Sequence, residues 1–100
     1  MSHNVERLFP FVLRSRSFIV GRQRIERSKS DLQWLLITED ISENSENEIL
    51  NDFKHYPIVK YFRSTDLEHL LELNGTKFVA FKKGDLAKSI YQELKDHRIN

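Results

Sequence analysis

The seven residues that begin at Gly21 contain the densest group of side chains in the chain that could do chemistry. This segment, Gly21-Arg-Gln-Arg-Ile-Glu-Arg27, directly follows a short β-branched run. We expect the glycine to open a helix, and the unpaired N–H groups of a first helical turn attract phosphate. Arginine forks bind phosphate oxygens and guanine edges through paired hydrogen bonds. The candidate contacts to a nucleic acid are Arg22, Gln23, Arg24 and Arg27, and the alternative is a solvated helix face.

The charge of the chain is unevenly distributed, although its net value is only +1. Residues 1–30 carry seven basic and two acidic side chains, a net charge of +5, whereas residues 31–100 carry nine basic and thirteen acidic ones, a net charge of −4. This asymmetry indicates a polyanionic partner for the basic segment, with chance clustering as the alternative. Arg14 and Arg16 would extend the basic face if the first helix runs beside the second.

Patterns typical of catalysis or metal binding are weak. The chain has no cysteine, and its four histidines are too widely spaced to predict a metal site, so His55 and His69 are expected on the surface. No glycine-rich phosphate loop or nucleophile elbow occurs. Glu39 and Asp40 follow an apolar run, where carboxylates can form a catalytic or ligand-binding site. The alternative is that they organise the turn and cap the following helix. We expect no enzyme, no metal and no cofactor.

The length of 100 residues predicts one domain over residues 1–100, with loose ends at 1–5 and 97–100. No apolar run approaches the roughly 18 residues of a transmembrane span, and residues 1–7 lack the apolar core of a signal peptide. The expected location is therefore the cytoplasm.

Apolar periodicity alternates between helix and strand along the chain. Helices are expected over 8–13, 22–29, 46–56, 65–73 and 84–94, and strands over 18–20, 32–38, 58–62 and 77–81. Ser45 with Glu48 fits a capping box for the third helix, Ser64 or Thr65 could cap the fourth, and Asn74-Gly75 could end it. The order α-β-α-β-α-β-α-β-α predicts a three-layer α/β/α sandwich with a mixed sheet of about four strands.

Several short motifs occur in an order that resembles one family. They are Phe9-Pro10, Val20-Gly21, Leu35-Leu-Ile-Thr-Glu-Asp40, Ser42-Glu-Asn-Ser45, Tyr56-Pro-Ile-Val59, Thr65-Asp-Leu67 and Val79-Ala-Phe81. Over residues 8–95 the chain resembles the kink-turn-binding ribosomal protein superfamily, of the large-subunit L-seven-Ae and L-thirty-e type. It is most similar to the small bacterial YlxQ-like branch.

The resemblance implies an L-thirty-e-like fold that binds structured RNA through the start of the second helix and the loop after the fourth. At the start of the second helix, the family's Asn, Glu and Lys correspond to Gln23, Arg24 and Arg27, so that Arg24 reverses the charge of a carboxylate. The opposing loop would contribute Asn74 and Lys77.

We therefore expect a non-enzymatic RNA-binding protein, ribosome-associated or acting on other structured RNA, with ribosomal or assembly proteins as further partners and no membrane contact. The alternative is a protein–protein interaction module on the same fold. Its acidic stretch from Glu39 to Glu48 would then meet a basic partner.

Overall fold

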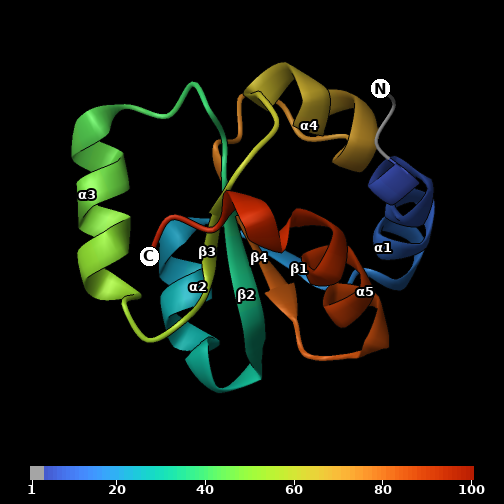
Figure 1. Ribbon diagram of the computed structural model, residues 1–100, viewed down its shortest axis with the longest axis horizontal. Helices are drawn as coiled ribbons and strands as arrows, with labels where there is room; N and C mark the ends of the chain where they lie inside the picture. Colours follow the sequence, from blue (N-terminus) through green and yellow to red (C-terminus); the bar gives the residue numbers. More distant parts are fainter. Residues whose placement is uncertain (1–3) are drawn as a thin grey trace.

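The strand Leu32–Ile37 (β2) carries apolar side chains on both of its faces. Trp34 and Leu36 pack into one buried cluster, and Leu35 and Ile37 pack into another, because successive strand residues point to opposite sides of a sheet. Such a strand needs cover on both faces. The computed structural model, which describes residues 4–100, provides that cover with helices on either side of a central sheet (Figure 1).

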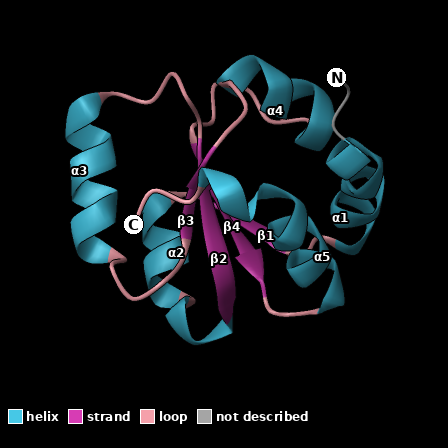
Figure 2. Cartoon of the chain, in the orientation of Figure 1, coloured by secondary structure: helices cyan, strands magenta, loops and turns pink. Residues whose placement is uncertain are grey.

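Helices and strands alternate along the whole described chain, as Figure 2 shows. The helices are α1 (Phe9–Ser15), α2 (Arg22–Arg27), α3 (Glu43–Asp52), α4 (Ser64–Leu71) and α5 (Asp85–Leu94). Besides β2, the strands are β1 (Phe18–Val20), β3 (Ile58–Lys60) and β4 (Phe78–Lys82). Short 3-10 helices occupy Asn4–Leu8, Lys29–Asp31 and Lys95–His97.

The four strands form one mixed sheet in the order β1-β4-β2-β3. β4 lies between β1 and β2 and is antiparallel to both, while β2 and β3 are parallel. Helices α1, α4 and α5 cover one face, around Phe9, Trp34 and Ile90. Helices α2 and α3 cover the other, around Ile25 and Phe53. The predicted three-layer α/β/α sandwich with a mixed four-stranded sheet is therefore confirmed.

The predicted helix caps are wrong at three places. The N-cap of α3 is Ser42 rather than Ser45, and its Oγ accepts a hydrogen bond of 3.2 Å from the Ser45 N–H. The N-cap of α4 is Arg63, whose N–H donates to the Asp66 carboxylate. This helix ends at Glu72, in a left-handed conformation, before Asn74-Gly75 is reached. The sequence offers several capping residues near each end, and tertiary packing selects among them.

The strand expected over 58–62 ends at Lys60, because Phe62 adopts a left-handed backbone with φ of 63°. Both ends for which loose chain is expected make contacts where the structure describes them. Val5 is buried in the core, while residues 1–3 lie outside the described residues. At the other end, the Ile99 N–H donates to the Ile58 carbonyl at 2.9 Å, and the Asn100 side chain bonds to the same edge.

Within residues 4–100, no helix is long and apolar enough to cross a membrane.

Candidate nucleic-acid interface

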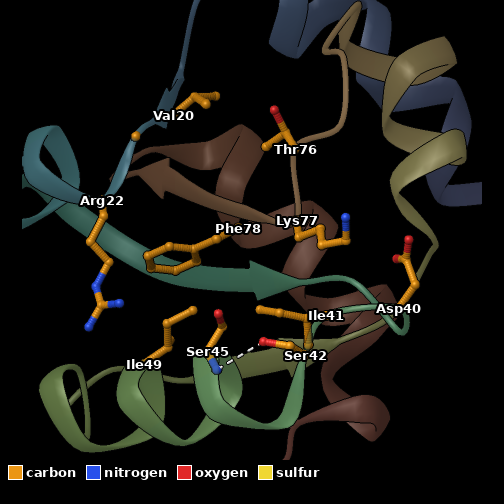
Figure 3. A pocket seen from close by; sticks show the side chains of 11 residues that line it. Val20, Arg22, Asp40, Ile41, Ser42, Ser45, Ile49, Thr76, Lys77 and Phe78 are labelled. Carbon is orange, nitrogen blue, oxygen red and sulfur yellow. Dashed lines mark hydrogen bonds between the residues drawn. The ribbon is translucent and has the colours of Figure 1, made fainter.

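A pocket of about 630 Å³ lies where β1 meets α2, opposite the first residues of β4 and the start of α3. We term it the junction pocket (Figure 3). Its apolar lining consists of Val20, Ile41, Ile49 and Phe78. Its polar lining comes from helices and loops, and comprises Gly21, Arg22, Asp40, Ser42, Ser45, Thr76 and Lys77. The pocket thus combines an apolar surface with hydroxyl, carboxylate and cationic groups.

Gly21 makes the sharp turn from β1 into α2. Its φ of 101° and ψ of 122° form a backbone conformation that residues with a Cβ rarely adopt. Gly21 is the N-cap of α2, and its carbonyl accepts from the Ile25 N–H at 2.9 Å. The buried Ile25 is the apolar anchor of this short helix, so the remaining side chains of Arg22–Arg27 are directed toward the surface.

Arg22 is held by two carboxylates of α3. Its Nη1 donates to Glu48 Oε1 at 3.1 Å, and its Nη2 forms a second ion pair with Asp52. Partial burial acts to lower the pKa of Arg22, but the hydrogen bonds to Glu48 and Asp52 outweigh burial and raise it. In Figure 3 the side chain points toward α3 rather than across the pocket. The predicted phosphate contact at Arg22 therefore has acidic competitors within the protein.

A second hollow, of about 560 Å³, is lined by all three residues of β1, by Leu13 of α1 and Arg24 of α2, by the end of α4 and by Lys82 of β4. We term it the β1 groove. Its basic side chains come from three elements and are Arg16, Arg24 and Lys82, with Glu72 as its one carboxylate. Its remaining lining is mainly apolar and comprises Leu13, Phe18, Ile19, Val20, Leu71 and Leu73.

The structure places four of the eight predicted contact residues in the two hollows and the other four elsewhere on the surface. Arg22 and Lys77 line the junction pocket, and Arg16 and Arg24 line the β1 groove. The others are exposed and line neither, namely Arg14, Gln23, Arg27 and Asn74. The Arg14 guanidinium lies 5.6 Å from the centre of the exposed Phe11 ring, which is a cation–π distance.

Sequence reasoning did not single out Lys82, the third cation of the β1 groove. Lys82 reaches this position because β4 is antiparallel to β1, and the Lys82 N–H donates to the Ser17 carbonyl at 2.9 Å. No local pattern around Lys82 signals this neighbour, because 64 residues of chain lie between it and Ser17.

Asp40 has a structural role at the start of α4. Its carboxylate accepts hydrogen bonds from the Ser64 N–H at 3.0 Å and from the Ser64 hydroxyl at 2.6 Å. The bond from the Ser64 hydroxyl is the main reason that the pKa of Asp40 lies well below its usual range. Asp40 is expected to cap the following helix, α3. It instead accepts hydrogen bonds from Ser64, the first residue of α4.

Comparison with known proteins identifies this fold in solved structures. No protein-family model matches the sequence, and no curated protein matches it. A protein of unknown function from Bacillus halodurans C has a TM-score of 0.83 at 9% identity, over 94% of this chain and 99% of that chain. A Giardia lamblia 15.5kD RNA binding protein has a TM-score of 0.67 at 13% identity, over 93% of this chain and 83% of that one. The chain therefore shares its mixed-sheet α/β fold with an RNA-binding protein.

Proposed function

We propose that this protein binds structured RNA and catalyses no reaction. Two facts support the proposal together: the fold is shared with an RNA-binding protein from Giardia lamblia, and basic side chains gather on both sides of the junction between β1 and α2. Fold alone does not define function, so the arrangement of charge at this junction carries the argument.

The observation on which the proposal rests is the contrast between paired and unpaired cations. Arg22, Lys29 and Lys60 each form a salt bridge with a carboxylate. Within residues 4–100, the side chains of the cations that line the two hollows beside Arg22 form no salt bridge, and these cations are Arg16, Arg24, Lys77 and Lys82. Cations without protein partners are available to neutralise phosphates, which dominate affinity for nucleic acids.

The proposed RNA is a kink-turn-like internal loop, in ribosomal or other cytoplasmic RNA. Gln23 and Arg27 would contact it from α2, and Asn74 and Lys77 would contact it from the loop before β4. Arg24 stands where the resembling family has a carboxylate, so guanine recognition by that carboxylate would be lost, and Arg24 would contact phosphates and base edges instead. Discrimination between RNA sequences would accordingly be modest, with phosphate contacts supplying most of the affinity.

The alternative, a module that binds a basic protein through residues 39–48, finds less support. Three of the five carboxylates in this stretch are already occupied within the protein. Asp40 bonds to Ser64, Glu46 pairs with Lys60, and Glu48 pairs with Arg22. Only Glu39 and Glu43 would be left for a partner, and two exposed carboxylates make a weak electrostatic surface.

The proposal is tested by titrating the protein with an RNA that contains a kink-turn and with a plain duplex of equal length. About four phosphate contacts would lower the affinity about 100-fold between roughly 50 and 200 mM salt. The double variant Arg24→Glu with Lys77→Glu should bind at least about tenfold more weakly. The charge-matched control is the double variant Lys88→Glu with Lys95→Glu, two exposed positions in and directly after α5 that line neither hollow. Equal binding by the two double variants contradicts the proposal, as does a lack of binding at low salt.

A further inference from the structure

We infer that the β1 groove is a docking site for an extended acidic peptide, which would add to the sheet as a fifth strand beside β1. The partner here is a protein, and it would use Arg16, Arg24 and Lys82, which are also among the cations available to RNA. The peptide would pair with the backbone of β1, which has a single sheet neighbour, β4.

The hydrogen-bonding groups of β1 alternate between β4 and the groove. The Lys82 N–H donates to the Ser17 carbonyl, and Phe18 lies opposite Phe81 in the register. In an antiparallel pair every second residue turns its N–H and C=O away from the neighbouring strand. Phe18 and Val20 therefore present their backbone donors and acceptors to the β1 groove, where both residues line the hollow.

The opposite edge of the sheet is covered, in contrast to β1. Val59 of β3 forms an antiparallel bridge with Arg98, and the Ile58 carbonyl accepts from the Ile99 N–H at 2.9 Å. The Ile58 N–H donates to the Asn100 side chain at 3.0 Å. An uncovered strand edge invites pairing with another chain, and β1 is the edge that leaves this possibility open in the described structure.

The two walls of the groove favour a peptide with alternating side chains. Phe18 and Val20 pack with the cluster under α1 and α4, and Leu13 and Leu73 line the groove on that side. Ile19 packs with the cluster under α2, the helix that carries Arg24. Because residues of an added strand alternate between the two faces, apolar side chains would meet the first wall and carboxylates would meet Arg24.

The charge of the groove distinguishes this occupant from a second copy of the chain. Three cations, Arg16, Arg24 and Lys82, outnumber the one carboxylate, Glu72. Two copies paired through β1 would bring these cations together, and like charges facing each other are destabilising. An RNA backbone offers acceptors for the N–H groups of Phe18 and Val20 but few donors for their carbonyls, whereas a peptide strand supplies both.

The test uses the full chain, labelled with nitrogen-15, and a ten-residue peptide that alternates glutamate with valine. We expect binding to shift the amide signals of Phe18 and Val20 and to slow their exchange with deuterium at least tenfold. A peptide with lysine in place of every glutamate should bind at least tenfold more weakly. Lys82→Glu should lower the affinity for the acidic peptide at least fivefold. The adjacent Lys83→Glu changes a residue outside the groove and should leave that affinity unchanged.

A proline at position 20 tests the backbone contact separately, because it deletes an N–H that faces the groove rather than β4. Val20→Pro should keep the circular dichroism spectrum and lose peptide binding. If Val20→Pro does not fold, the exchange rates of Phe18 and Val20 in the unaltered protein decide the question. The inference is overturned if the peptide leaves these amides unprotected, if both peptides bind equally, or if the protein dimerises through β1. These peptide outcomes are measured without RNA, so a failure of RNA binding in its own titration is distinguishable from a failure of peptide binding.

Discussion

Arg22 on α2 and Glu48 on α3 are joined by a hydrogen-bonded ion pair of 3.1 Å, and Asp52, one turn further along α3, binds the same guanidinium. The side chains of Arg22 and Asp52 are each a little over one-third exposed, and that of Glu48 is about two-thirds exposed. Exposed ion pairs contribute only about 0–1 kcal/mol to stability. The main consequence of this contact is therefore the position of Arg22, which is drawn toward α3 and away from the junction pocket.

Removing the two carboxylates should strengthen RNA binding. In the double variant Glu48→Gln with Asp52→Asn, Arg22 is released and can reach a phosphate, which adds about one charge contact and increases the affinity severalfold at low salt. The slope of log affinity against log salt concentration should also become steeper by about one, as expected for one additional phosphate contact. Titration with the kink-turn RNA at several salt concentrations measures both quantities.

The matched control removes two exposed carboxylates elsewhere, through Glu43→Gln with Glu68→Gln. General reduction of negative charge would strengthen binding equally in both double variants, and that result would rule out a specific role for the release of Arg22.

Asp40→Asn should destabilise the protein at neutral pH. The bonds from Ser64 favour the ionised carboxylate and hold the pKa of Asp40 well below its ordinary value. The stabilisation is thus fully present above the unfolded-state pKa of about 3.9 and is lost as the pH falls through the folded-state pKa. Thermal melts should show a lower midpoint for Asp40→Asn at pH 7 and a difference that shrinks in strong acid. Glu39→Gln, at the exposed neighbouring position, should melt like the unaltered protein at both pH values.

Trp34→Phe should cost about 2 kcal/mol or more of unfolding free energy. The substitution removes the hydrogen bond of 2.9 Å from Trp34 Nε1 to the buried Ala87 carbonyl, and it reduces the stacking on Phe81, whose ring centre lies 4.5 Å away. Urea unfolding followed by circular dichroism measures the loss. Tyr91→Phe removes only a long, exposed contact of 3.4 Å with Arg98, and a comparable loss in that variant would argue against the assigned role of the Trp34 bond.

Gly21→Ala should destabilise the protein by about 1–2 kcal/mol. A Cβ at this position would meet the Arg24 side chain at an ordinary 3.8 Å, so the cost arises from the backbone φ of 101° and not from a clash. Gly75→Asn is the comparison, because asparagine tolerates the left-handed φ of 71° found there. Chemical unfolding of the two variants should rank Gly21→Ala as clearly the less stable, and the reverse order would contradict this account of the turn.

The layers of the fold could be predicted from the sequence because they depend on local patterns. The apolar run of β2 indicates burial on both faces, and the alternation of helix and strand predicts the sandwich. The caps of α3 and α4 could not be chosen in the same way, since serines at 42, 45 and 64 are all suitable. Ser64, for example, is not the N-cap of α4 and instead bonds to Asp40, which reaches it only after the sheet has brought β2 and α4 together.

The candidate site was partly predictable for a related reason. A cluster of arginines in the sequence correctly indicates a basic surface at α2, but sequence alone does not reveal charges from distant elements. Arg22 meets Glu48 and Asp52, which follow it by 26 and 30 residues, and Lys82 joins Arg16 through the antiparallel pairing of β4 with β1. Both relationships arise from the topology of the fold. It brings carboxylates to Arg22 and places Lys82 near Arg16, so that some cations of the cluster are paired and others are not.

The central place of β4 has a consequence for how the chain folds during synthesis. β1 and β2 are not neighbours, and each pairs with β4. A nascent chain that ends before Phe78 can pair β2 with β3 but leaves β1 without a partner, and the backbone N–H and C=O groups on one edge of β2 stay unpaired. We expect such a chain to remain prone to aggregation or to chaperone binding until residue 82 has left the ribosome, when one strand closes two edges at once.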